Sequence, residues 1–155
     1  MFHVVLHEPE IPMNTGNLMR LTVNTRCRLH LVHPLGFELD DARLRRAGLD
    51  YREYADVSHH PDFATFLATV APQRVFAFSQ HSERLYVDEA YQPADVLLFG
   101  KESTGLPEDV MGHEAVTARL RIPIAPGGRS LNLANAAAVV VYEAWRQNEF
   151  RVPEH

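Results

Sequence analysis

Three short segments combine side chains that can bind a ligand with residues that favour tight turns. The first covers residues 8–20 and places Asn14, Gly16 and Asn17 ahead of Arg20. An asparagine at a helix start caps free N–H groups, and a glycine lets a neighbouring backbone approach closely. Arg20 borders the apolar face of the expected helix, where a guanidinium needs an anion or several acceptors. Arg20 is therefore either an anion-binding residue or a structurally paired one.

The second segment covers residues 100–107 and carries Gly100, Glu102 and Gly105. It is not a Walker loop, because that motif would need a glycine at the position of Asp95. Two glycines between a strand and a helix instead predict a pocket walled by backbone. Glu102 can accept from a ribose hydroxyl, an amide or a cationic group there, or it is a solvated loop acid.

The third segment covers residues 122–133 and ends in the longest helical pattern of the chain. We expect Ser130 to cap that helix, whose first N–H groups attract negative charge, and Arg129 adds to the attraction. A phosphate, a carboxylate or a developing alkoxide suits this place. The alternative, a capped helix with an exposed arginine, leaves Asn132 and Asn135 unexplained.

Strands and helices alternate along the chain in a way that positions these segments. Apolar runs predict strands at residues 2–6, 29–32, 74–78, 95–99 and 120–122, and helical spacing predicts helices at 14–25, 40–47, 61–70 and 130–148. This alternation predicts an α/β fold with a mainly parallel sheet and helices on both faces. Open sheets of this kind bind ligands beyond the carboxyl ends of their strands, so the loops after Leu6, Phe78, Phe99 and Ile122 are the candidate site.

Length and composition narrow the class further. The chain has 155 residues, a net charge of −5 and one cysteine, Cys27. We expect a single domain over residues 1–155 that needs no disulfide to build its core. The start of the chain lacks the pattern of a secretory signal and no window is apolar enough for a membrane span, so we expect a cytoplasmic location. The acidic balance argues against unspecific coating of nucleic acid, which needs clustered positive charge.

Motifs for other chemistries are missing from the sequence. The nine histidines include no H-E-x-x-H pattern, and Cys27 has no partner at zinc spacing, so we expect no metal site. We interpret the histidines as scattered surface residues. Neither a G-x-G-x-x-G nor a G-x-S-x-G motif occurs.

Taken together, the three segments resemble the signature motifs of the SPOUT methyltransferases, the α/β-knot family. The pattern N-x-G-N-x-x-R corresponds to residues 14–20, G-x-E-x-x-G-L to residues 100–106, and I-P followed by S-L-N to residues 122–132. Residues 44–51 and 141–147 are similar to the small TrmL branch, whose members are tRNA (cytidine/uridine) 2'-O-methyltransferases acting on the wobble ribose of leucine tRNAs. The resemblance extends over nearly the whole chain.

The resemblance implies a C-terminal deep trefoil knot, a homodimer, and S-adenosyl-L-methionine as methyl donor, with no separate RNA-binding domain. By position, it implies that the cofactor pocket consists of Phe78, Gly100, Glu102, Ile122, Ser130 and Leu131. It also implies that Arg20 is catalytic, and we expect Ser130 and Asn132 to orient the ribose and the methionine end. Lys101 and Thr104 stand at variable positions where some relatives have a proline and a basic residue.

Because the chain is acidic overall, we expect a segregated basic surface to meet the tRNA anticodon loop. The candidates are Arg45 and Arg46, with Arg43 nearby, Arg129 beside the pocket, and Tyr142. Tyr142 either stacks on a base or packs at the dimer interface. Two other functions remain open: methylation of another tRNA position or of ribosomal RNA, and a catalytically silent RNA-binding dimer.

Overall fold

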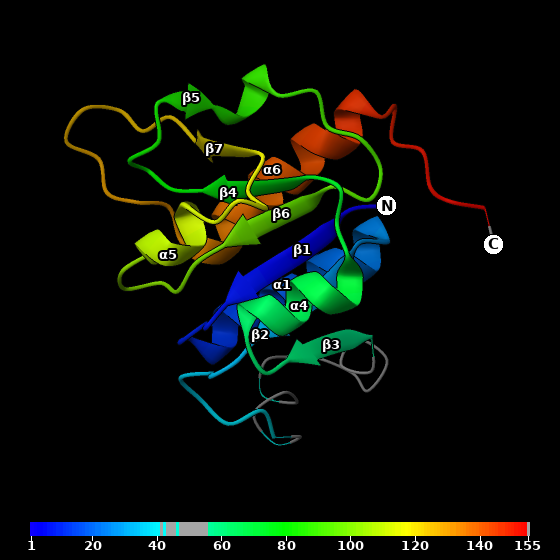
Figure 1. Cartoon of the computed structure of the whole chain (residues 1–155), viewed down its shortest axis with the longest axis vertical. Helices are drawn as coiled ribbons and strands as arrows, with labels where there is room; N and C mark the ends of the chain where they lie inside the picture. The colour runs from blue at the N-terminus through cyan, green and yellow to red at the C-terminus, as the bar shows by residue number, and fades with distance from the viewer. Residues whose placement is uncertain (41, 43–45, 47–55, 155) are drawn as a thin grey trace.

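A seven-stranded parallel sheet forms the centre of the molecule (Figure 1). The computed structural model describes residues 1–40, 42, 46 and 56–154. In chain order the elements are β1 (His3–His7), α1 (Pro12–Thr25), β2 (Arg28–Val32), β3 (Val57–His60), α4 (Phe63–Val70), β4 (Val75–Phe78), β5 (Arg84–Leu85), the 3-10 helix η1 (Tyr86–Asp88), β6 (Val96–Phe99), α5 (Glu108–Met111), β7 (Ala118–Arg121) and α6 (Leu133–Gln147). The strand order is β3-β2-β1-β6-β4-β7-β5. Every pairing described within this sheet is parallel, which confirms the predicted α/β class.

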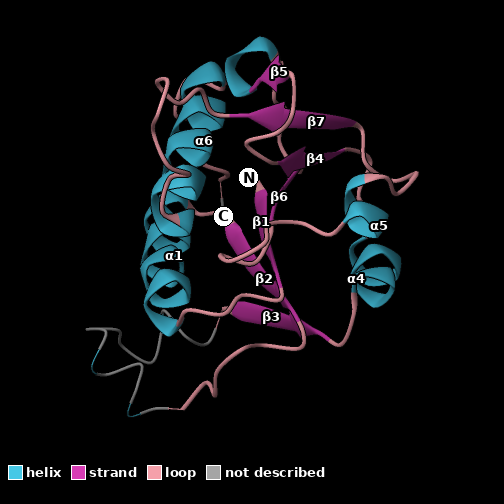
Figure 2. Cartoon of the chain, turned by 90° about the vertical axis from the view of Figure 1, so that its left-hand side faces the viewer, coloured by secondary structure: helices cyan, strands magenta, loops and turns pink. Residues whose placement is uncertain are grey.

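Helices cover both faces of the sheet, as predicted. Figure 2 shows α1 and α6 on one side and α4 and α5 on the other. Successive residues of a strand point to opposite faces. In β6, Leu97 and Phe99 join the apolar cluster under α1 and α6, whereas Val96 and Leu98 join the cluster under α4 and α5. Burial on both sides explains why this strand is a continuous apolar run.

Several elements differ from the sequence prediction. The strands β3 and β5 and the short helix α5 were not predicted, and most of the helix predicted at residues 40–47 lies outside the described residues. Helix α4 begins at Phe63, and Asp62 is its cap, its side chain accepting from the N–H of Thr65 at 2.7 Å. Pro61 therefore precedes the cap instead of occupying the first helical position.

Some histidines form a buried row, so the interpretation of all nine as scattered surface residues is wrong. Nδ1 of His3 lies 2.9 Å from Nε2 of His30, and Nδ1 of His30 lies 3.0 Å from Nε2 of His60. His7, His30 and His60 are buried. The rings of His30 and His60 both pack edge-on against Phe66 of α4. The row crosses β1, β2 and β3 under that helix.

Candidate active site

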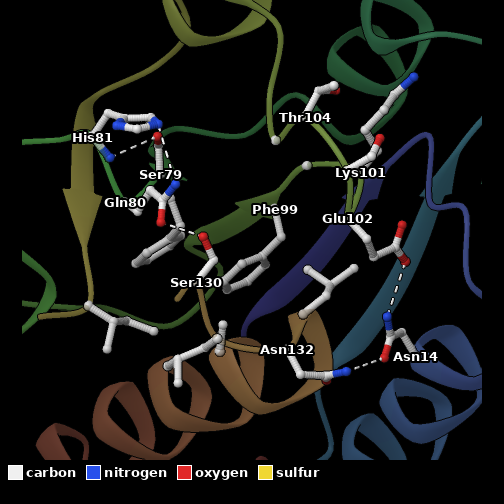
Figure 3. A pocket seen from close by; sticks show the side chains of 18 of the residues that line it. Asn14, Ser79, Gln80, His81, Phe99, Lys101, Glu102, Thr104, Ser130 and Asn132 are labelled. Carbon is white, nitrogen blue, oxygen red and sulfur yellow. Dashed lines mark hydrogen bonds between the residues drawn. The ribbon is translucent and has the colours of Figure 1, made fainter. Parts of the chain in front are cut away.

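A pocket of about 480 Å³ lies at the carboxyl edge of the sheet, where the three segments converge (Figure 3). Its walls come from the loops after β4, β6 and β7 and from the first turns of α1 and α6, and they comprise Ile11, Asn14, 78–81, 99–105, Ile122, Ile124, 130–133 and Ala136. All six residues predicted for cofactor binding line it. The pocket lies where the sequence predicts the site, beyond the strand ends, because parallel strands bring those ends to one edge.

One wall of the pocket is apolar. The rings of Phe78 and Phe99, at the ends of the neighbouring strands β4 and β6, stack with centroids 4.8 Å apart and planes 12° apart. Ile122 and Leu131 lie on the pocket wall with them. An apolar wall with a few polar groups on the opposite side is typical of a small-molecule site.

Gly100 is required by close packing of backbone. A Cβ atom at this position would lie 2.2 Å from the N atom of Leu106 and 2.3 Å from the carbonyl carbon of Gly105. The loop folds back here, with the N–H of Gly105 donating to the carbonyl of Lys101 at 2.9 Å. Gly105 itself has a φ of 71°, which favours glycine. The prediction of a pocket wall made of backbone fits this turn.

A directional chain of hydrogen bonds joins the three segments. Nδ2 of Asn132 donates to Oδ1 of Asn14 at 2.9 Å, and Nδ2 of Asn14 donates to Oε1 of Glu102 at 3.4 Å (Figure 3). The carboxylate of Glu102 also accepts from the N–H groups of Glu10 at 2.7 Å and Ile11 at 3.2 Å. Glu102 is therefore not the solvated loop acid of the alternative interpretation.

Both helix starts at the pocket differ from the prediction. Asn14 lies inside α1, and the cap residue Ile11 makes no side-chain hydrogen bond to the helix. The carboxylate of Glu102 binds this end of the helix instead, by accepting from the N–H of Ile11. Ser130 is not the cap of α6 either. That residue is Asn132, whose Oδ1 accepts from the N–H groups of Ala134 and Asn135. Asn132, one of the two asparagines that the capped-helix alternative left unexplained, is thus the cap itself.

The hydroxyl of Ser130 donates instead to Oε1 of Gln80, in the loop after β4 (Figure 3). Nε2 of Gln80 lies 3.4 Å from Nε2 of His81. This loop was predicted to border the site, but the one side chain predicted there was Phe78, the last residue of β4. A polar triplet directly after an apolar strand, residues 79–81, is the signal that would have pointed to Gln80.

The remaining predicted residues lie away from the pocket wall. Arg20 is an exposed residue of α1 and not a buried-edge one, and Arg129 is exposed in the loop before Ser130. Tyr142 is 46% exposed on α6 and meets Trp145 edge-on at 5.7 Å. Arg46 is exposed, and Arg43 and Arg45 lie outside the described residues. Over the described ranges, no cluster of His, Cys, Asp and Glu is arranged to hold a metal ion.

The fold and the pocket define an α/β protein with a cavity of small-molecule size at the carboxyl edge of a parallel sheet. The sequence profile of the SpoU rRNA Methylase family matches residues 1–142. The chain belongs to this family, which confirms its resemblance to the SPOUT methyltransferases. The C-terminal trefoil knot stays a prediction that follows from this membership.

Individual relatives cover the whole length of the chain. A tRNA (cytidine(34)-2'-O)-methyltransferase of Acidovorax is 52% identical over 155 residues, which are 99% of this chain and 96% of the relative. A solved structure described as giving structural insights into the 2-OH methylation of C/U34 on tRNA superposes with a TM-score of 0.88. It is 45% identical in sequence, and the match covers 97% of this chain and 98% of that one. The methyltransferase AviRb from Streptomyces viridochromogenes, solved with AdoMet, has a TM-score of 0.81 at 22% identity over 95% of this chain and 57% of its own, a likeness of fold.

Proposed function

We propose that this protein is an S-adenosylmethionine-dependent methyltransferase that modifies the ribose 2'-hydroxyl of the wobble nucleotide, cytidine or uridine 34, of tRNA. The convergence of the three motif segments on one pocket carries the proposal. The full-length similarity to a relative named for this reaction supports the choice of substrate. We further propose leucine tRNAs as the substrates and the cytoplasm as the location, since mature tRNA is found there.

The pocket suits S-adenosylmethionine by its size and lining. Its volume of about 480 Å³ falls in the range of small-molecule sites, about 300 to 1,000 Å³. The stacked rings of Phe78 and Phe99, with Ile122 and Leu131, offer an apolar wall to a purine. Gly100 and Ser130 offer polar contacts at the opposite loops. When bound, S-adenosylmethionine supplies an electrophilic methyl group and leaves as a neutral thioether.

The protein's own groups must align the ribose and favour loss of its 2' proton. Alignment alone contributes up to about 7 to 11 kcal/mol to such reactions. We assign ribose and methionine contacts to Ser130 and Asn132, which lie at the pocket. A guanidinium with a pKa above about 12 is a poor base, so Arg20 holds a phosphate or the developing alkoxide instead. The proton then leaves through a phosphate oxygen or water.

We propose a homodimer in which α1 and α6 meet the same helices of a second copy. These helices pack side by side on one face of the sheet (Figure 2). Their exposed apolar side chains include Met13, which is 59% exposed, and Val23, Val139 and Tyr142. Arg20 also lies on α1 and does not line the pocket of its own chain. In the proposed dimer, Arg20 of each copy reaches the pocket of the other. Sedimentation velocity tests this: V139R is expected to shift the dimer to monomer.

We propose that Arg46 and Arg129 belong to the surface that binds the anticodon loop, together with Arg45. Phosphate contacts of arginines release counterions, so each lost contact reduces the salt dependence of binding by about one unit of slope. Replacing Arg45 and Arg46 by alanine is therefore expected to weaken tRNA binding and to flatten its salt dependence. An unchanged slope would remove these two residues from the surface.

The decisive experiment is transfer of labelled methyl from S-adenosylmethionine to total tRNA that lacks its own wobble 2'-O-methylation. We expect the label on the wobble ribose of leucine tRNAs, mapped by nuclease digestion. Label at another position or on ribosomal RNA would contradict the assigned substrate. Cofactor binding without any transfer would instead favour a catalytically silent RNA-binding dimer.

A further inference from the structure

Two loops at the pocket hold each other through their carboxylates. The side chain of Glu102 accepts from the N–H groups of Glu10 at 2.7 Å and Ile11 at 3.2 Å. In return, Oε1 of Glu10 accepts from the N–H of Ser103 at 3.0 Å and from its hydroxyl at 2.6 Å. We call these four hydrogen bonds the reciprocal clamp. Each carboxylate thus binds the backbone of the loop that carries the other.

Charge favours the clamp. Hydrogen bonds that involve an ionised carboxylate are about twice as strong as neutral ones. The bonds from Ser103 hold the pKa of the Glu10 carboxyl below its usual value, so this group is ionised at neutral pH. The ion pair of Lys101 with Glu8, at 3.2 Å, adds a cation beside the two acids. Glu102 in addition lies at the positive end of the α1 dipole.

The clamp joins the two parts of the site that the proposed reaction must align. The loop 100–105 lines the pocket proposed for the cofactor, and α1 carries Asn14 and Arg20. Glu10 does not line the pocket itself. Its effect on a bound ligand must therefore pass through Ser103 and the loop that contains it.

We propose that Glu10 is a positioning residue of this enzyme, which fixes the loop 100–105 against the start of α1 by accepting both bonds from Ser103. The proposal rests on the proposed methyltransferase function. Without Glu10, the loop loses both bonds of Ser103 to the segment before α1 and keeps the contacts of Glu102, the ion pair of Lys101 with Glu8 and its own turn at Gly105. The loop is then held less firmly at the cofactor pocket and against the start of α1, which stays joined to it through Glu102. Cofactor affinity and turnover at saturating cofactor therefore fall together.

Three variants test this with purified full-length protein. Glu10→Ala removes the acceptor, and Glu10→Gln keeps a carbonyl oxygen in its place. Glu108→Ala is the matched control, since that carboxylate pairs with Arg119 at 3.3 Å outside the pocket. The readouts are the Kd for S-adenosylmethionine by calorimetry without RNA, kcat and KM with tRNA, and the melting temperature.

We expect Glu10→Ala to raise the cofactor Kd about tenfold and to lower kcat about tenfold even at saturating cofactor, the size of one lost charge-assisted hydrogen bond. Glu10→Gln restores most of both, and Glu108→Ala matches the wild type. Ser103→Ala gives a smaller loss that adds nothing to Glu10→Ala in the double variant, because the shared bond is already gone.

Four results would overturn the positioning role. They are wild-type Kd and kcat in Glu10→Ala, a fall in melting temperature alone, failure of Glu10→Gln to rescue, and full additivity with Ser103→Ala. Each of these leaves the proposed function standing, since the wild type still binds the cofactor and methylates tRNA. A wild type that binds no S-adenosylmethionine would instead refute the proposed function, and the positioning role with it.

Discussion

Nδ2 of Asn132 donates to Oδ1 of Asn14 at 2.9 Å, so the cap of the last helix is bonded to the first turn of the first helix. The bond has a direction, because Asn14 must present its own Nδ2 to the carboxylate of Glu102. Turning the amide of Asn14 over would place its oxygen against that carboxylate. The two asparagines and the acid therefore form one ordered chain across 118 residues of sequence.

Asn132→Asp separates helix capping from this chain of bonds. An aspartate still accepts from Ala134 and Asn135, so the cap of α6 is kept and the free energy of unfolding falls only by the lost bond to Asn14, about 1 kcal/mol. It cannot donate to Asn14, so methyl transfer is expected to fall up to about tenfold, the effect of one lost part-buried hydrogen bond. Asn132→Ala loses the cap as well, which costs about 1 kcal/mol more. Urea unfolding and initial rates give the two readouts. Full activity in Asn132→Asp would show that the bond to Asn14 is dispensable.

Gly100→Ala is expected to abolish cofactor binding. The new Cβ would overlap the backbone of Gly105 and Leu106, at a cost of about 1 to 3 kcal/mol or more. Gly112→Ala is the control, because its Cβ meets the carbonyl of Glu108 at 3.1 Å outside the pocket. Calorimetry with S-adenosylmethionine measures the effect. Equal binding by both variants would mean that the loop tolerates a displaced backbone.

Gln80→Leu is expected to weaken cofactor binding through Ser130. In the wild type the Ser130 hydroxyl donates to Gln80, which leaves its lone pairs available to a ligand. Leucine has a similar size and no acceptor, so the hydroxyl loses its fixed direction. We expect a three- to tenfold higher Kd for S-adenosylmethionine, about 1 kcal/mol. Gln80→Glu keeps an acceptor and should bind close to normally, and equal weakening by both would contradict the role of this bond.

Arg20→Lys is expected to lose most turnover while cofactor binding stays unchanged. Lysine keeps the charge but not the planar fork that binds a phosphate in two places. We expect the cofactor Kd to stay unchanged because the proposed partner of Arg20 is a phosphate or the developing alkoxide of the RNA, and not the cofactor. Single-turnover methylation of tRNA measures the loss. Near-full turnover would show that a point charge suffices at this position.

The histidine row makes the fold sensitive to acid. Burial, with the neighbouring imidazoles of His3 and His60, lowers the pKa of His30 to about 3. The unfolded chain takes up this proton near pH 6.5, so stability is full above that pH and falls as the pH drops toward 3. His30 alone accounts for roughly 2 kcal/mol of lost stability at pH 5. Urea unfolding at pH 7.5 and 5.0 is expected to show this loss, with a smaller one in His30→Leu. Equal stability at the two pH values would contradict it.

The strands buried on both faces were predictable because their residues are apolar whichever way they point. Residues 29–32 and 95–99 are examples, and the structure places β2 and β6 there. Strand β3 was missed for the opposite reason. Its sequence, Val57–His60, is mostly polar, and it fits the sheet because His60 bonds to a histidine of the next strand. Such a partner is far away in sequence and cannot be inferred from local periodicity.

The sequence predicted which residues line the pocket better than it predicted the contacts that each of them makes. The three motif segments were correctly expected to converge, because topology brings strand ends together. The predicted starts of both α1 and α6 were wrong. Serine is a residue type that often caps helices, yet the cap of α6 is Asn132, two residues after Ser130. Glu102 was expected to contact a ligand, whereas much of its bonding capacity goes to residues 10, 11 and 14. Only three-dimensional proximity reveals those donors.

The carboxylate that binds the start of α1 belongs to Glu102. In the sheet, β1 lies between β2 and β6, and β6 comes much later in the chain. A chain made from its N-terminus therefore emerges from the ribosome with α1 lacking its carboxylate and with one edge of β1 open. An open strand edge is a place where other chains can pair. The first half of this protein can finish folding only after the loop that follows β6 has been synthesised.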